Sequence, residues 1–165
     1  MLQVVAAVMA AAGVLLAALA VGVWRRRRDP AGLSLAGLLL AVAWWGVAYA
    51  VELQADDLLA RQRWGDAKYV GVNALAYAWL VFVLQYTGRA AWLTPRRLAL
   101  LAIEPVALLV VLAVPRTHDL VRTYAPGSPG QLPLVETGPV FWLHFAYTNV
   151  VLVVATGLFV LAMAR

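Results

Sequence analysis

The chain has 165 residues, of which 64% are hydrophobic and only 13% are charged. A soluble domain is about one-quarter charged, so this composition excludes an ordinary water-soluble protein and favours an integral membrane protein. The net charge is +5, but the basic residues stand between apolar runs, where they face lipid headgroups rather than nucleic acid. The absence of cysteine excludes disulfides, thiolate metal sites and cysteine nucleophiles.

Five long apolar runs follow one another along the chain, and we expect each of them to form a transmembrane helix. A helix rises about 1.5 Å per residue, so roughly 20 residues cross the ~30 Å hydrocarbon core. Helices are preferred over strands because a helix satisfies its own backbone amides in lipid. The predicted fold is an all-α polytopic bundle, a single domain over residues 1–165 without a soluble domain. Its expected helices cover about residues 2–24, 33–53, 69–86, 98–114 and 140–164.

The segments between these runs are polar and predict both loops and orientation. The longest, residues 115–139, includes the turn-rich stretch Pro126–Gly130, so we expect an irregular loop outside the bilayer. The dense cluster Arg25–Arg28 belongs in the cytoplasm by the positive-inside rule. The sequence therefore predicts a multi-pass plasma-membrane protein whose N-terminus is extracytoplasmic and whose Arg165 is cytoplasmic.

Polar residues at helical spacing predict a ligand pocket in the outer half of the membrane. Residues three, four or seven positions apart share one face of a helix, and three of the expected helices carry such a polar face. Each residue taken singly could instead be an interfacial aromatic or an interhelical hydrogen-bonding group. The predicted pocket, for an unknown ligand, is lined by Tyr49, Glu52, Asn73, Tyr77, His144, Tyr147 and Thr148.

Glu104 is the least expected residue, because it lies inside the fourth apolar run and is followed by Pro105. An ionisable group at a helix centre costs on the order of 2.5–3.5 kcal/mol, so it usually faces a bundle interior or a cavity. Pro105 removes one backbone hydrogen bond and predicts a kink. The alternative is that Glu104 is protonated or reaches toward the nearby interface.

The sequence predicts no metal, cofactor or catalytic centre. His118 and Asp119, together with Glu136 and His144, match no closed zinc spacing, so we interpret the first two as residues of a solvated loop. Phosphate-binding, dinucleotide, zinc-protease and serine-hydrolase motifs are all absent from the sequence.

A series of short motifs resembles the N-terminal seven-transmembrane sensor region that precedes bacterial and archaeal histidine kinases. The motifs stand in the family's order and cover most of the chain. They are Trp45 with residues 48–53, Trp64 with residues 68–71, residues 82–88, 103–105 and 118–120, and residues 138–144 followed by Tyr147.

The resemblance implies a non-catalytic signal-input module that passes a stimulus to a cytoplasmic kinase or other output domain. It also implies a homodimer in a full-length sensor, and a bundle of seven helices of which this chain would contain five. The positions that the resemblance singles out, without assigning them as ligand contacts, are Glu52, Tyr69, Gly71, Tyr86, Pro105, His118, Trp142 and Tyr147.

Two other functions remain open from the sequence. In a small transporter or channel component, Glu104 and Pro105 would lie on a permeation path, although no paired repeat is present. In a structural subunit of a membrane complex, a stable protein partner would take the place of a ligand.

Overall fold

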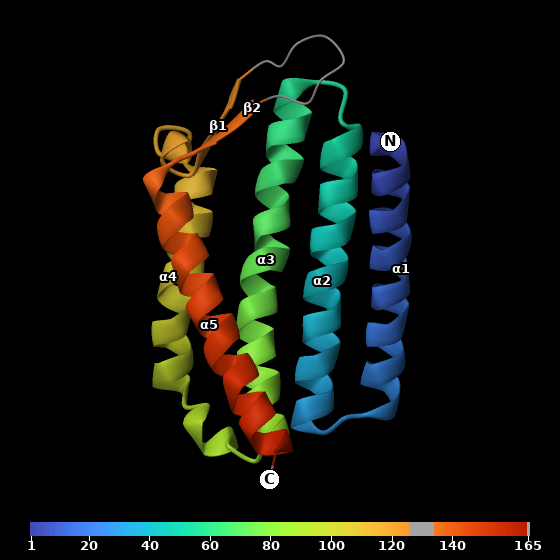
Figure 1. The fold of residues 1–165 in the computed structure, drawn as a ribbon, viewed down its shortest axis with the longest axis vertical. Helices are drawn as coiled ribbons and strands as arrows, with labels where there is room; N and C mark the ends of the chain where they lie inside the picture. Colours follow the sequence, from blue (N-terminus) through green and yellow to red (C-terminus); the bar gives the residue numbers. More distant parts are fainter. Residues whose placement is uncertain (126–133, 165) are drawn as a thin grey trace.

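The computed structural model describes residues 1–125 and 134–164, and it is 83% helical. The described residues form five α-helices, which lie side by side with their long axes roughly parallel (Figure 1). This arrangement confirms the predicted all-α bundle. The helices are α1 (Leu2–Arg26), α2 (Pro30–Gln54), α3 (Leu58–Tyr86), α4 (Pro95–Ala113) and α5 (Pro139–Met163).

Side-chain caps explain where three of these helices begin. The Asp29 carboxylate accepts a hydrogen bond from the Gly32 amide at 2.9 Å and so caps α2. Asp57 caps α3 in the same way, and the Thr94 hydroxyl caps α4. Caps of this kind satisfy amides that have no partner within the helix.

Helix α3 begins at Leu58, eleven residues before the start at Tyr69 that the sequence predicted. The predicted loop over residues 54–68 is limited to residues 55–57, and the prediction was wrong for residues 58–68 because a fall in hydropathy was taken for the end of a helix. The Asp57 cap starts the helix early, and its polar first turns bind other elements of the bundle. Hydropathy reports where a helix leaves lipid, whereas capping decides where the helix begins.

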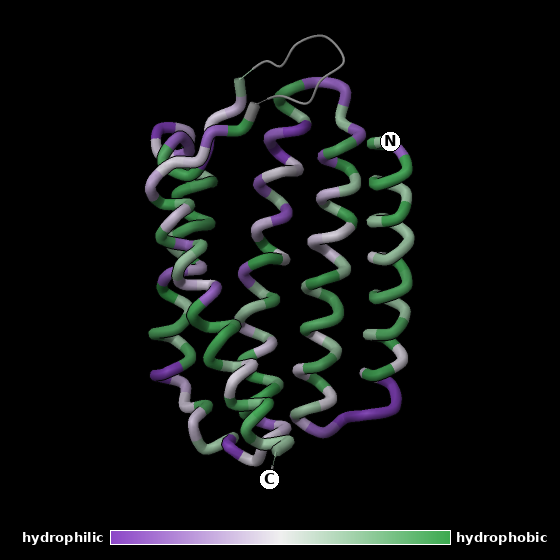
Figure 2. The backbone as a smooth tube through the Cα atoms, viewed as in Figure 1, coloured by the Kyte–Doolittle hydropathy of each residue, from purple (hydrophilic) through white to green (hydrophobic). Residues whose placement is uncertain are grey.

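Four of the described helices, α1, α2, α3 and α5, are long and apolar enough to cross a membrane. Helix α4 has 19 residues and contains the charged residues Arg96, Arg97 and Glu104, so length and composition alone do not mark it as a span. It lies beside α3 and α5, within the apolar middle zone of the bundle (Figure 2). The five spans expected from the sequence are therefore supported for four helices.

A two-stranded antiparallel hairpin covers one end of the bundle, where the sequence predicted an irregular loop. Strand β1 (Arg122–Ala125) pairs with β2 (Leu134–Thr137), and a short 3₁₀ turn, η2 (His118–Leu120), precedes them. Gly138, which follows β2, packs tightly against the backbone of η2. A Cβ atom at this position would lie 2.7 Å from the backbone carbonyl oxygen of Asp119 and closer still to that of Leu120, so a larger residue would not fit. The stretch Pro126–Gly130 lies outside the described residues.

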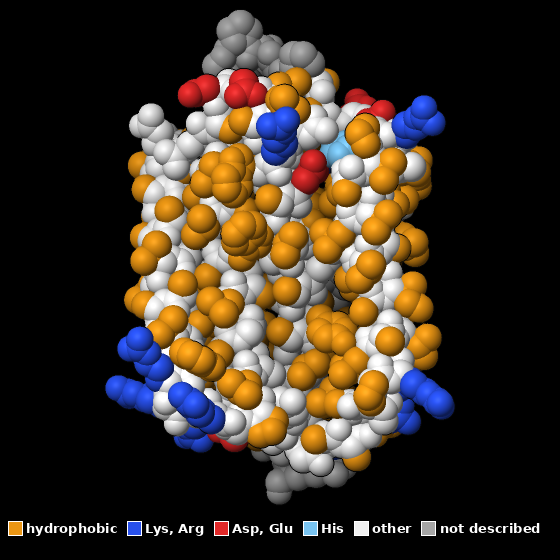
Figure 3. Space-filling model, turned by 180° about the vertical axis from the view of Figure 1, so that it is seen from behind, with side chains coloured by type: hydrophobic (Ala, Val, Ile, Leu, Met, Phe, Trp, Pro, Cys, Tyr) orange, Lys and Arg blue, Asp and Glu red, His pale blue; other side chains and the backbone are white. Residues whose placement is uncertain are grey.

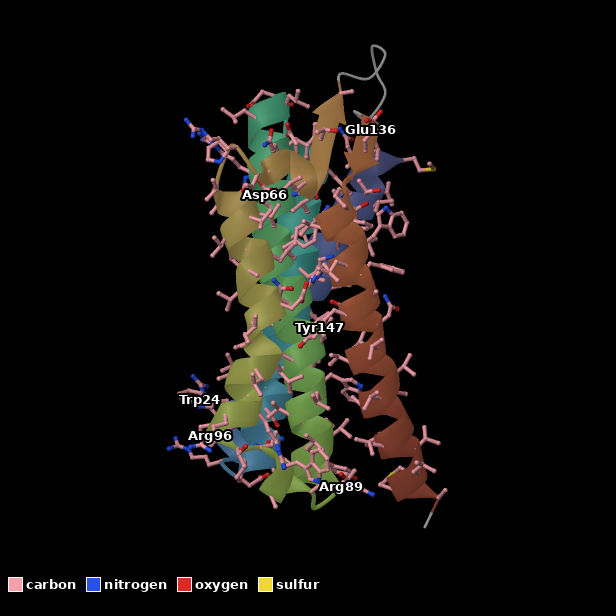
Figure 4. All side chains as sticks on the ribbon, turned by 90° about the vertical axis from the view of Figure 1, so that its left-hand side faces the viewer. Trp24, Asp66, Arg89, Arg96, Glu136 and Tyr147 are labelled. Atoms are coloured by element: carbon pink, nitrogen blue, oxygen red, sulfur yellow. The ribbon has the colours of Figure 1, made fainter. Side chains whose placement is uncertain are left out.

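The two ends of the bundle differ in charge. Trp24, Arg89 and Arg96 lie at one end, and Asp66 and Glu136 lie at the other (Figure 4). We call the first the arginine end, which holds residues 25–28, 89, 96 and 97, and the second the hairpin end. Basic side chains gather along the rim of the arginine end, and a broad hydrophobic band separates the two ends (Figure 3). The N-terminus lies at the hairpin end and the C-terminal end of α5 at the arginine end (Figure 1).

Candidate functional site

A cavity of about 350 Å³ opens at the hairpin end, between α2, α3, the hairpin and the first turn of α5. Its volume falls in the range of about 300–1,000 Å³ that is typical of small-molecule sites. One part of its lining is charged or phenolic and the other part is apolar. The lining residues are Tyr49, Glu52, Leu53, Arg61, Lys68, Tyr69, Arg122, Tyr124, Val135, Thr137 and Phe141.

Glu52 is the centre of the hydrogen bonds around this cavity. Its side chain accepts from Lys68 Nζ at 2.5 Å and from the Tyr124 hydroxyl at 3.1 Å. The Lys68 ammonium also lies 4.9 Å from the centre of the Tyr49 ring, within cation–π range. Glu52 is only 7% exposed, and a carboxylate so deeply buried requires partners of this kind. The residue therefore ties α2 to α3 and to the hairpin.

A second ion pair joins α3 to the hairpin. The Arg122 guanidinium, which is 3% exposed, donates to the Asp66 carboxylate at 2.6 Å and lies about 5 Å from the rings of Tyr69 and Tyr124. His118 Nε2 lies 3.0 Å from the same carboxylate. The prediction that His118 stands in a solvated loop was wrong, because the pairing with Asp66 draws η2 down onto α3 and buries the ring.

Two local features allow this network to form. Burial, followed by the neighbouring Glu52 carboxylate, raises the pKa of the Tyr124 hydroxyl, and the Arg122 charge opposes the rise only in part. Tyr124 therefore remains a protonated donor to Glu52. Gly65 leaves the space in which the three side chains meet, since a Cβ atom there would lie 2.8 Å from both Arg122 and Glu52 and closer still to Tyr124.

A separate polar cluster lies deeper in the bundle, between α4 and α5. His144 Nδ1 lies 2.9 Å from Glu104 Oε1, and the Thr148 hydroxyl lies 3.4 Å from the other nitrogen of the ring. The Tyr69 ring packs against His144 edge to face. The second oxygen of Glu104 is buried and has no hydrogen-bond partner in the described structure. Glu104 therefore faces the bundle interior, where it pairs with His144.

Tyr147 compensates for the backbone hydrogen bond that Pro105 removes. In an α-helix the amide of residue 105 would donate to the carbonyl of Leu101, but proline has no amide hydrogen. The Tyr147 hydroxyl, near the middle of the bundle in Figure 4, donates to that carbonyl at 2.6 Å instead. The Asn73 amide also donates to the carbonyl of Pro105 at 3.2 Å. Helix α4 continues through Pro105 without a break, and side chains of α3 and α5 satisfy the carbonyl groups around that residue.

The seven residues of the predicted pocket do not form one site: the structure divides them between the cavity at the hairpin end and the region deeper in the bundle. Tyr49 and Glu52 line the cavity at the hairpin end. The other five lie deeper, on α3 and α5. Asn73, Tyr77, Tyr147 and Thr148 surround a space of about 10 Å³, which is about enough for one water molecule. His144 lies next to this space, in contact with Thr148. In that deeper group the Tyr77 hydroxyl donates to the carbonyl of Leu98 at 3.2 Å. Among the described residues, no group of three His, Asp or Glu side chains is placed to hold a metal ion.

Sequence reasoning missed several charged and phenolic residues of the hairpin-end cavity and its network, among them Asp66, Lys68, Arg122 and Tyr124. Asp66 stands at helical spacing with Gln62, Tyr69 and Asn73, a polar stripe that becomes visible once α3 is known to begin at Leu58. Arg122 and Tyr124 alternate along a strand and so share one face of the hairpin. Neither signal was used, because both segments were interpreted as loops.

The family model described as the N-terminal 7TM region of histidine kinase matches residues 8–165. The chain belongs to this family. No curated protein and no solved structure matches the chain. Together with its apolar helices, membership makes the chain a multi-pass plasma-membrane protein that contacts the lipid bilayer and serves as a sensor region of histidine kinases.

In this histidine kinase sensor region, several of the positions that the sequence resemblance singled out lie in the two clusters. Tyr69 lies between them, because its ring contacts both Arg122 and His144. Gly71 has a packing role, since a Cβ atom there would lie 2.7 Å from the Ala41 carbonyl oxygen on α2. Trp142, by contrast, is exposed on the bundle surface.

Proposed function

We propose that this chain is the signal-input module of a histidine-kinase-type protein and that it detects a small molecule in the cavity at the hairpin end. The observation that carries the proposal is the cavity itself, whose volume of about 350 Å³ is bordered by α2, α3, the hairpin and α5. A ligand there would contact all four elements at once. It would compete with the existing ion pairs of the lining, in which Lys68 binds Glu52 and Arg122 binds Asp66.

Helix α5 is the element that would carry the change across the membrane. It runs unbroken for 25 residues, about 37 Å at 1.5 Å per residue, from Phe141 at the cavity to the arginine end. Two contacts hold it to α4 along the way, His144 with Glu104 and Tyr147 with Leu101. A ligand shifts such an arrangement only if it binds two packings of the bundle with different affinity. The output would be a cytoplasmic kinase or another signalling domain.

The proposed orientation places the hairpin end and its cavity outside the cell. It is supported by the cluster Arg25–Arg28 together with Arg89, Arg96 and Arg97, all at the arginine end, which the positive-inside rule assigns to the cytoplasm. Reporter fusions after Arg28 and after Met163 test it. Both reporters should be active as cytoplasmic fusions. Activity of both as periplasmic fusions would reverse the orientation, and activity on opposite sides would contradict the proposed arrangement of the helices.

Autophosphorylation of a sensor kinase that carries this region tests the proposed function. The kinase is reconstituted in vesicles and exposed to a library of small molecules from the hairpin side. The decisive variants are Arg61→Gln, which changes a residue of the cavity lining, and Arg63→Gln, which removes an exposed charge two residues away on the same helix.

A stimulating compound should lose its effect in the Arg61 variant and keep it in the Arg63 control. Equal responses of the two variants would reject the cavity as the sensing site. Replacement of Glu52 should change the basal kinase activity as well, because this residue links three of the elements around the cavity.

A further inference from the structure

A second and larger cavity, of about 630 Å³, lies at the arginine end of the bundle. It is bounded by α3, α4 and α5 and by the 3₁₀ turn η1 (Ala90–Trp92), which joins α3 to α4. Nine of its eleven lining residues are apolar: Leu80, Leu84, Trp92, Leu93, Leu98, Leu100, Leu101, Val154 and Leu158. The cavity at the hairpin end, in contrast, is lined by several charged side chains.

The other two lining residues are Arg89 and Arg97. Neither takes part in any of the salt bridges within residues 1–125 and 134–164. The lining itself contains no carboxylate that could neutralise them. The Arg97 guanidinium lies 4.6 Å from the centre of the ring of Trp92, another residue of the lining. An apolar hollow thus carries two positive charges whose only described partners are an aromatic ring and a backbone carbonyl.

We propose that this cavity binds one anionic phospholipid, with its phosphate between Arg89 and Arg97 and an acyl chain against the leucines of α3, α4 and α5. The chemistry on both sides matches: the guanidiniums complement a phosphodiester, and the leucine wall complements hydrocarbon. The charges stand at the end of the bundle that holds the other arginines, where a bilayer has its headgroups. Basic pockets between helices on the cytoplasmic side are a general form of anionic lipid site.

The site is independent of the proposed sensing cavity, since only α3 and α5 contribute to both and no residue is shared. The turn that borders the arginine-end cavity depends on Gly88, whose positive φ of 73° lets the chain reverse direction directly after α3. This turn brings Arg89 back toward the cavity instead of letting it continue along the helix.

Native mass spectrometry of the purified protein tests the proposal, with phosphatidylglycerol and phosphatidylcholine as the two lipid probes in matched detergent. The wild-type protein should retain one phosphatidylglycerol at low lipid concentration and no comparable phosphatidylcholine. Equal retention of both lipids, or retention of neither, would overturn the proposal. A second copy of the chain in place of the lipid, seen as a dimer peak without bound lipid, would overturn it too.

Variants locate the bound lipid. Arg89→Gln with Arg97→Gln should weaken phosphatidylglycerol binding by roughly 30-fold, because each basic residue near an anionic surface contributes about fivefold. Arg25→Gln with Arg26→Gln removes the same charge from the same end outside the cavity and should leave the tightly held lipid in place. Similar losses in both double variants would refute a defined site.

A second variant tests the apolar half of the site without any change in charge. Leu158→Trp fills the hollow beside the acyl chain and should reduce phosphatidylglycerol retention several-fold while leaving the charge-state distribution of the folded monomer unchanged. Undiminished retention in this variant would show that the lipid lies on the outer surface of the bundle and would reject the cavity as its site.

Discussion

Replacement of Tyr147 by Phe isolates the hydrogen bond that makes up for the missing amide at Pro105. The variant keeps the ring and removes only the hydroxyl, which donates to the Leu101 carbonyl at 2.6 Å. This carbonyl has no helical donor, since residue 105 is proline. Removal of the hydroxyl therefore leaves a polar group in an apolar environment without any hydrogen bond.

The expected change in the free energy of unfolding depends on whether another donor can replace the Tyr147 hydroxyl at the Leu101 carbonyl. An unsatisfied buried acceptor costs about 1–3 kcal/mol, whereas hydrogen bonds between membrane helices contribute only ~0.6 kcal/mol on average. We expect Tyr147→Phe to lower the free energy of unfolding by about 1–2 kcal/mol, above that average, because the helix cannot supply a substitute donor. In a Pro105→Ala background the alanine amide donates to Leu101 instead. The same Tyr147 substitution should then cost less than about 0.6 kcal/mol.

A double-mutant cycle measures this difference. The four proteins are unfolded reversibly from mixed micelles, and helicity is followed by circular dichroism. Tyr77→Phe is the matched control, since its hydroxyl donates to the carbonyl of Leu98, which also accepts from the helical amide of residue 102. Tyr77→Phe should cost about the same in both backgrounds. Equal costs of Tyr147→Phe with and without Pro105 would refute the compensation argument.

Three further predictions concern the two polar clusters. Gly65→Ala should destabilise the fold by roughly 1–3 kcal/mol in the same unfolding assay, because its methyl group would overlap three side chains, whereas Gly22→Ala has open space and should cost nothing. Glu104→Ala alone should cost about 1–3 kcal/mol, since it leaves the buried His144 ring without its partner on α4, and Glu104→Leu with His144→Phe should recover most of the loss. A double variant as unstable as the single one would contradict this pairing. Asp66→Ala should lower stability by about 3–5 kcal/mol, because it leaves the buried Arg122 guanidinium without its counter-charge; wild-type stability would show that the ion pair contributes nothing.

The sequence by itself determined that the chain is a helical membrane bundle. Long apolar runs have one structural solution in lipid, because backbone amides must be satisfied within each segment. The same runs, read with the arginine cluster at residues 25–28, predicted which helix ends lie together, and the structure has them at one end. The order of short motifs was sufficient to indicate the family that the family model then showed.

Only the tertiary structure decided which polar residues meet. Glu52 and Tyr124 are 72 residues apart, and Glu104 and His144 are 40 apart. Helical periodicity places residues on a face but does not say which other helix that face contacts. The early start of α3 was missed for a different and local reason, since its capping residue Asp57 stands in a polar stretch that hydropathy alone marks as a loop. Local chemistry therefore specified the elements, while the long-range pairing of charges and the filling of space around Gly65 and Pro105 specified the site.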